Sequence, residues 1–139
     1  MPPLTLRYGW VSPAWSFALP LHQLVAIVDD DPGVRGSIAS LLRSAGLEGA
    51  QFGDGRELLA SPDLERFACV VTDLHMPCVD GRQLQAELSS RGCRHPLIVM
   101  TAFPTAIVRE QMLASGAHAF LTKPVDPDDL LEAIAAAIG

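Results

Sequence analysis

The stretch LVAIVDDDPG, residues 24–33, decides the fold of this chain. Its first five residues are apolar, as in a strand that is buried on both faces. Asp31 and Pro32 then give the start signal of a helix, a capping side chain followed by a proline in the first turn. The stretch therefore predicts a buried strand that ends in acid and leads directly into a helix.

The alternation of a short apolar run with a segment of helical period recurs to the end of the chain. Gly46 ends the first helix, because glycine readily adopts the positive φ found at helix C-termini. Asp126 and Pro127 start the last helix, with two further acids in its first turn. The predicted strands are 24–28, 50–52, 67–72, 97–100 and 117–121, and the predicted helices are 32–45, 55–60, 82–90, 104–115 and 127–139. Five βα units predict an α/β fold in which helices cover both faces of a parallel sheet.

Polar side chains stand where the predicted strands end. The first strand runs into Asp29–Asp31, the third into Asp73, and the fourth into Thr101. Lys123 closely follows the fifth strand and is the only lysine of the chain. If the strands are parallel, carboxylates, a hydroxyl and an ammonium gather at one edge of the sheet. Such an edge can hold a divalent metal and a phosphoryl group.

Composition limits the classes of function. The 139 residues fit one domain, and 49% apolar with 19% charged residues is ordinary for a globular protein. A net charge of −6 argues against a broad nucleic-acid surface, which needs clustered Lys and Arg. The chain has three cysteines, Cys69, Cys78 and Cys93, which are odd in number and lack a CxxC spacing. This pattern argues against a disulfide framework and a zinc site, and it favours a reducing cytoplasm as the compartment.

Residues 1–23 differ from the rest of the chain. Four prolines interrupt every possible element, and both tryptophans, Trp10 and Trp15, fall in this segment. It lacks the unbroken apolar stretch of a signal peptide or a membrane helix. We expect an irregular extension in front of a domain at 24–139; a start codon assigned too far upstream and a segment that docks on a partner both remain open.

Five motifs, in order and at matching spacing, resemble one known family. They are Val28-Asp29-Asp30-Asp31, Asp73-Leu74-His75-Met76-Pro77 followed by Asp80-Gly81, Thr101-Ala102, Gly116-Ala117, and Lys123-Pro124. From about Leu24 to Gly139 the chain resembles the CheY-like receiver domain of two-component response regulators, most of all its FixJ-like branch. The resemblance implies a doubly wound flavodoxin-like fold with strand order 2-1-3-4-5.

The resemblance also implies the chemistry. Asp73 would accept a phosphoryl group from a sensor histidine kinase or phosphotransfer protein, so that the chain is a signalling domain rather than an enzyme. Mg²⁺ would be bound by three carboxylates and one backbone carbonyl: Asp29, Asp30, Asp73 and the carbonyl of His75. The resemblance assigns phosphoryl binding to Thr101, Ala102 and Lys123, a switch role to Thr101 and Phe120, and a cis bond to Lys123-Pro124. Asp31 is instead predicted to be a helix cap.

Other positions bear on regulation. Phosphorylation would alter a partner-binding face formed by the fourth helix, fifth strand and fifth helix, which includes Arg109, Met112, His118 and Asp128. A homodimer through this face is plausible. Relatives of the FixJ-like type usually carry a DNA-binding domain after the receiver; this chain stops at Gly139, so we expect a stand-alone receiver or a fragment, without direct DNA binding and without a membrane segment.

His75 lies two residues after Asp73, and Phe103 lies two residues after Thr101. Both positions would flank the phosphoryl group, and both depart from the residues common in the family. We hypothesise that the apolar Phe103 limits the access of water and slows the loss of phosphate.

Three alternatives compete with this interpretation. An aspartate-nucleophile phosphatase would place a second acid where His75 stands. A dinucleotide-binding domain would show GxGxxG after the first strand, where DDDPG stands instead. The serious alternative is an interaction module that works on a receiver fold without phosphate.

Overall fold

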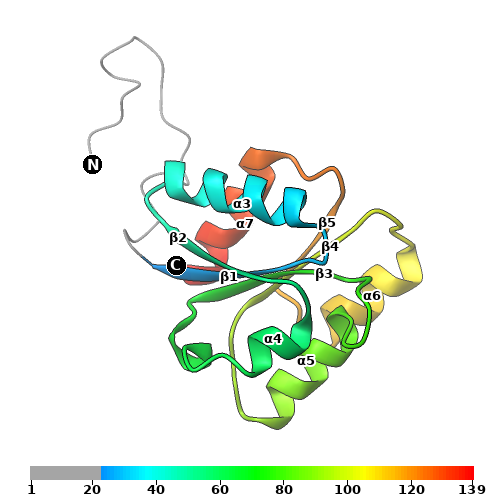
Figure 1. Cartoon of the computed structure of the whole chain (residues 1–139). Coiled ribbons are helices and arrows are strands. Elements are labelled where there is room, and N and C mark those ends of the chain that lie inside the picture. The colour runs from blue at the N-terminus through cyan, green and yellow to red at the C-terminus, as the bar shows by residue number, and fades with distance from the viewer. Residues whose placement is uncertain (1–22) are drawn as a thin grey trace.

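The sheet has five parallel strands in the order β2-β1-β3-β4-β5 in a computed structural model, which describes residues 23–139 (Figure 1). The strands are β1 (Leu24–Val28), β2 (Glu48–Phe52), β3 (Cys69–Asp73), β4 (Leu97–Thr101) and β5 (Ala119–Thr122). β1 pairs with β2 on one side and β3 on the other, so the winding reverses between β1 and β3. This confirms the predicted fold class and strand order. The extension predicted at 1–23 lies outside the described residues, apart from Gln23.

Helices cover both faces of the sheet. α3 (Pro32–Ser44) and α7 (Pro127–Ile138) pack on one face, and α4 (Gly55–Leu59), α5 (Gly81–Ser90) and α6 (Ala106–Ala114) pack on the other (Figure 1). A short 3₁₀ helix, Leu64–Arg66, lies between α4 and β3. None of the helices within residues 23–139 is long and apolar enough to cross a membrane.

The alternation of side chains along the strands divides the core in two. Val25 and Ile27 of β1 pack with α3 and α7, whereas Ala26 and Val28 pack against the opposite helices. All four side chains are fully buried. Because both faces are covered, the central strands read as continuous apolar runs, which is why the strands were recognisable in the sequence.

Capping side chains fix where the helices begin. Asp31 accepts hydrogen bonds from the backbone N–H groups of Gly33 at 2.8 Å and Val34 at 3.3 Å, which confirms its predicted role as a cap. Asp126 caps α7 in the same way. Gly46, just after α3, has a φ of 83°. The Asp31 cap lets α3 begin soon after β1 ends, so that Asp29 and Asp30 lie between the strand and the helix at one edge of the sheet.

The structure corrects two sequence predictions on α6. Pro104 does not begin this helix: Thr105 is the cap, accepting a hydrogen bond from the N–H of Val108 at 3.2 Å, and the helix starts at Ala106. Met112 does not belong to an exposed face, because its side chain is only 2% exposed and packs in the core. The same helix carries Arg109 on its exposed side.

We predict that Cys78→Gly stabilises the fold. Cys78 has a φ of 68°, in the left-handed region that disfavours a residue with a Cβ by about 1–2 kcal/mol. Glycine removes this strain but loses roughly 0.5–1 kcal/mol more backbone entropy on folding. We therefore expect the free energy of unfolding, measured by urea denaturation under reducing conditions, to rise by about 0.5–1 kcal/mol.

Cys78→Ala is the matched control. Alanine removes the thiol but keeps the Cβ, so the strain and the stability should stay close to those of the wild type. An equal gain in both variants would mean that the thiol, and not the backbone, limits stability.

Candidate functional site

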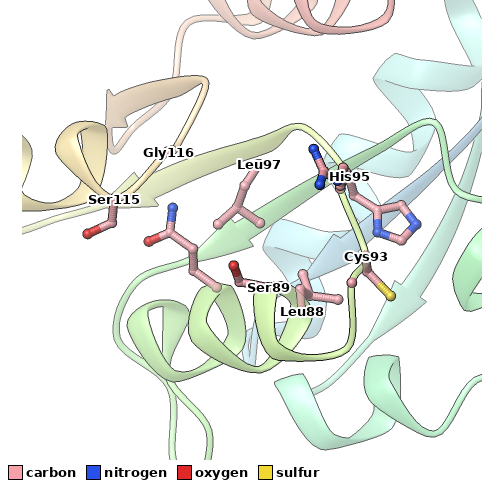
Figure 2. Close-up of a pocket in the computed structure, with 10 residues that line it drawn as sticks. Leu88, Ser89, Cys93, His95, Leu97, Ser115 and Gly116 are labelled. Atoms are coloured by element: carbon pink, nitrogen blue, oxygen red, sulfur yellow. The ribbon is translucent and has the colours of Figure 1, made fainter.

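A cavity of about 500 Å³ lies at the amino-terminal edge of the sheet (Figure 2). The cavity is lined by the carboxyl-terminal part of α5, the start of β4 and the end of α6. Among its lining residues, Figure 2 labels Leu88, Ser89, Cys93, His95, Leu97, Ser115 and Gly116. No carboxylate lines it. The polar groups predicted from the strand ends lie at the opposite edge of the sheet.

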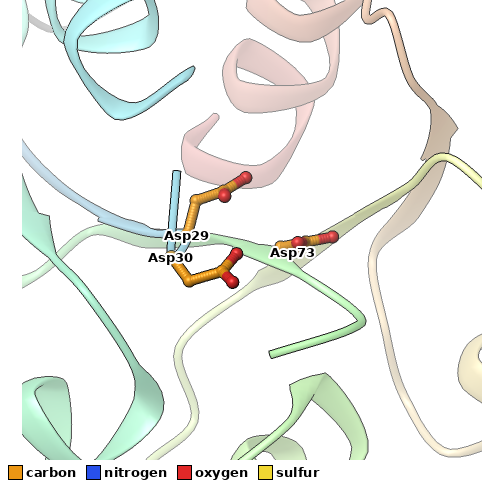
Figure 3. Close-up of side chains that lie close together, drawn as sticks. All are labelled: Asp29, Asp30 and Asp73. Atoms are coloured by element: carbon orange, nitrogen blue, oxygen red, sulfur yellow. The ribbon is translucent and has the colours of Figure 1, made fainter. Parts of the chain in front are cut away.

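Three carboxylates meet at the carboxyl ends of β1 and β3. Asp29 and Asp30 follow β1, Asp73 ends β3, and Figure 3 shows their side chains close together. One carboxylate oxygen from each lies within 4.8 Å of the others. Asp29 is fully buried and Asp73 is 7% exposed, whereas Asp30 is open to solvent. The strand order therefore brings together acids that lie far apart in the sequence.

Lys123 bridges two of these acids. Its Nζ donates a hydrogen bond to Oδ2 of Asp29 at 2.7 Å and lies 3.4 Å from Oδ2 of Asp73. The backbone N–H of Lys123 donates to the carbonyl of Thr101 at 2.8 Å, which ties the end of β5 to that of β4. The Lys123-Pro124 peptide bond is cis, as the resemblance implied. The single lysine thus lies where its charge meets the acids.

Every polar atom of Asp29 has a partner. Its N–H donates to the carbonyl of Phe52 at 3.1 Å, and its Oδ1 accepts from the N–H of Asp31 at 2.9 Å. Oδ2 takes the Lys123 ammonium, and its carbonyl accepts from Nη1 of Arg35 at 2.6 Å. The side chain and the main chain of Asp29 are therefore both fixed by hydrogen bonds. The Arg35 contact had no counterpart in the sequence prediction.

Burial and charge act on the Asp73 carboxyl in opposite directions. Burial raises its pKa, the Lys123 ammonium lowers it, the Asp29 charge raises it, and a backbone hydrogen bond from His75 lowers it; the balance is a raised pKa. The pKa of Lys123 is also raised, since its bond to Asp29 and the attraction of Asp73 outweigh the effect of burial. The single Lys123 ammonium does not balance the three carboxylates, and the remaining negative charge favours the binding of a cation.

These residues fit a hard divalent cation. Two carboxylates about 4 Å apart repel by ~4 kcal/mol at an effective dielectric near 20, and a bound cation offsets this repulsion. The cluster offers oxygen donors without cysteine or histidine nitrogen, a donor set that suits Mg²⁺ better than Zn²⁺. His75, whose carbonyl was predicted as a further ligand, lies two residues beyond Asp73 in an exposed loop.

The remaining predicted site residues lie around this cluster. Thr101 is fully buried at the end of β4, and its Oγ1 accepts a hydrogen bond from the N–H of Phe103 at 3.0 Å. Ala102 is exposed and, with Lys123, lines a groove of about 680 Å³. Phe120 is 9% exposed and packs in the core on the side of α4, α5 and α6.

Two aromatic rings meet from the loops that follow β3 and β4. The ring centroids of His75 and Phe103 are 6.1 Å apart at an interplanar angle of 68°. Phe103 is 74% exposed, which is unusual for so large an apolar side chain. The pair connects the loop after β3 to the loop after β4.

Comparison with known proteins gives one consistent family. Residues 25–135 match the family model described as "Response regulator receiver domain". Nodulation protein W of Bradyrhizobium diazoefficiens is 32% identical over 96% of the chain and 59% of its own length. Transcriptional regulatory protein FixJ of Azorhizobium caulinodans is 37% identical over 88% of the chain and 56% of its own length. The chain therefore spans somewhat over half the length of these curated relatives.

A solved structure agrees with this family. The structure of the Francisella response regulator 1452 receiver domain superposes with a TM-score of 0.79 at 26% identity, and the match covers 84% of this chain and 97% of that one. Sequence and fold thus lead to the same family.

We predict that Asp73→Asn stabilises the metal-free protein at neutral pH. A carboxyl whose pKa is raised by folding destabilises the folded state at any pH above its unfolded pKa. The advantage of the variant should therefore appear as the pH rises above the ordinary value of 3.8 and vanish below it. Urea unfolding at several pH values, with a chelator present, measures this difference. A lower stability of the variant at neutral pH would mean that attraction to Lys123 outweighs burial.

Proposed function

The chain belongs to the response regulator receiver domain family of two-component systems, and we propose that it accepts a phosphoryl group on Asp73 in the presence of Mg²⁺. The observation that carries the proposal is the meeting of three acids and one ammonium at a single sheet edge. The identified family and this geometry support the same chemistry. A reducing cytoplasm is the compartment that we propose, since the three cysteines are free thiols.

The proposed transfer is an in-line displacement at phosphorus. A carboxylate oxygen of Asp73 forms a bond to the phosphorus of a phosphohistidine, and the bond from phosphorus to the imidazole nitrogen breaks. The leaving imidazole takes up a proton. Asp29, Asp30, Asp73 and the His75 carbonyl would hold Mg²⁺, which when bound supplies positive charge to the phosphoryl oxygens. Lys123, whose Nζ lies 3.4 Å from Oδ2 of Asp73, would pair with a further phosphoryl oxygen.

Thr101 supports a link between this chemistry and the partner. A hydroxyl can donate one hydrogen bond while it accepts others, so Thr101 can donate to a phosphoryl oxygen and keep the bond from the Phe103 N–H. Its movement toward Asp73 would then draw the loop after β4 inward. Phe120 is buried in the core beside β4, where it pairs with Val99, and we propose that its ring adjusts to the space that Thr101 leaves.

Two surfaces support the proposed partners. A sensor kinase or phosphotransfer protein must bring its histidine to Asp73, and the groove beside Lys123 offers apolar contacts there, including Val34, Ile38 and Val125. The downstream partner would bind the face of α6, β5 and α7, where Arg109, His118 and Asp128 are exposed. Direct binding to nucleic acid is not proposed, in line with the net charge of −6. A homodimer through the same face stays a prediction.

We predict that phosphorylation is lost in Asp73→Ala. With Mg²⁺ and a phosphorylated donor or acetyl phosphate, mass spectrometry of the wild type should show one adduct of about 80 Da, the mass of a phosphoryl group replacing a proton. Asp73→Ala should show none, because the acceptor oxygen is gone. Asp31→Asn is the matched control: it removes a neighbouring acid, and asparagine caps a helix as well as aspartate does, so the adduct should remain.

The outcome separates the alternatives. Absence of an adduct in the wild type would favour the interaction module that works without phosphate. Repeated turnover of small phosphate esters would favour a phosphatase.

We predict that Phe103→Glu shortens the lifetime of the phosphorylated form. His75 and Phe103 pack together from the loops that follow Asp73 and Thr101, and an apolar ring excludes water that an exposed carboxylate would admit and orient. We expect loss of phosphate to accelerate several-fold, as measured by the decay of the adduct after removal of the donor. Phe103→Leu keeps an apolar side chain and should change the rate much less. Equal rates for all three proteins would exclude a role for Phe103.

A further inference from the structure

Arg35 makes a contact that the proposed chemistry does not use. It lies near the start of α3, and its Nη1 donates a hydrogen bond of 2.6 Å to the main-chain carbonyl of Asp29. Helical side chains point back toward the helix N-terminus, which explains how Arg35 reaches the strand end that precedes its own helix. The contact joins α3 to the point where the chain leaves β1.

Helix stability does not account for this placement. A cation in the first turns of a helix faces the positive end of the helix dipole, where a negative side chain would be favoured. The Nε atom of Arg35 is also buried and has no hydrogen-bond partner among the described residues. The bond to the Asp29 carbonyl is therefore the contact that holds the guanidinium in place.

The peptide unit that Arg35 holds is the one that joins Asp29 to Asp30. The Asp29 side chain is already fixed by the Asp31 N–H and by Lys123. Asp30 is exposed, and its carboxylate belongs to the cluster of possible ligands. The orientation of the peptide plane before Asp30 sets the direction in which its side chain leaves the backbone. Arg35 thus acts on Asp30 through the main chain.

Arg35 also stands over the neighbouring loop. A Cβ added to Gly53, just after β2, would lie 3.8 Å from Nη1 of Arg35 and 2.7 Å from Oε2 of Glu57. Glu57 accepts hydrogen bonds from the N–H groups of Gly53 and Asp54. The guanidinium of Arg35 therefore lies between the end of β1 and the loop that follows β2, and this loop is itself fixed by the hydrogen bonds to Glu57.

From these contacts we propose that Arg35 is a positioning residue, which orients the Asp29–Asp30 peptide so that the Asp30 carboxylate is ready to bind Mg²⁺. This inference rests on the proposed Mg²⁺ site. Arg35 forms no ion pair with the carboxylates of the cluster, so it is not itself a ligand. Outer contacts of this kind orient the groups that bind a metal directly and raise the affinity of the site.

The sign of the effect distinguishes positioning from charge. Removal of a positive charge near a cation site should by itself strengthen cation binding, because a repulsion disappears. Loss of positioning should weaken it. Arg35→Met keeps the apolar stem and removes the donor, so its affinity for Mg²⁺ reports which effect prevails.

We predict that Arg35→Met raises the dissociation constant for Mg²⁺ about tenfold, as measured by isothermal titration calorimetry of the full chain with MgCl₂. Arg43→Met is the matched control, because Arg43 is an exposed arginine on the same helix with no contact to the end of β1. Its dissociation constant should stay close to that of the wild type. In metal-free protein, the amide nitrogen resonance of Asp30 should shift in Arg35→Met and not in Arg43→Met.

An Arg35→Met dissociation constant equal to or below that of the wild type would overturn the inference and leave the Mg²⁺ site intact. Failure of the wild type to bind Mg²⁺, or unchanged binding in Asp30→Asn, would overturn the proposed site together with the inference. If circular dichroism shows that Arg35→Met does not fold, Arg35→Gln replaces it, since its shorter amide does not reach the Asp29 carbonyl.

Discussion

One ammonium shared between two largely buried carboxylates is the contact on which the functional edge depends. Lys123 lies 2.7 Å from Asp29 and 3.4 Å from Asp73. Lys123 follows β5, Asp29 follows β1, and Asp73 ends β3. Only a sheet whose winding reverses between β1 and β3 brings these acids side by side. The strand order of the fold therefore determines which side chains meet at this edge.

The arrangement favours ligand binding over the stability of the metal-free state. Burial raises the pKa of Asp73, and the charge of Asp29 adds to this rise, so the ionised acceptor is disfavoured when no cation is bound. A single lysine offsets this only in part. A bound cation would stabilise the ionised carboxylates and so offset this effect. The same acids that weaken the empty fold are therefore those that would perform the reaction.

The sequence predicted the strand ends because both of their signals are local. A buried run followed by acid, and a capping side chain followed by proline, are each contained within ten residues. The burial of Met112 was not predicted, because it depends on how α6 is rotated against the sheet. The cap of α6 at Thr105 is local but was missed, because Pro104 directly before it is itself a common start signal of a helix. The contact of Arg35 with the Asp29 carbonyl has no pattern in the chain, since it joins a side chain to a backbone group.

One hydroxyl links Thr101 to the aromatic pair of His75 and Phe103. The Thr101 hydroxyl accepts a hydrogen bond from the N–H of Phe103, and the Phe103 ring in turn packs against His75. Phe120 lies in the core on the side of α4, α5 and α6. If Thr101 moves toward a phosphoryl group on Asp73 and keeps that bond, Phe103 must move with it, and its contact with His75 must change. The same movement would then change both the packing of Phe103 on His75 and the position of the loop that leads into α6. The residue that detects the phosphate would therefore also set how long water is kept from it.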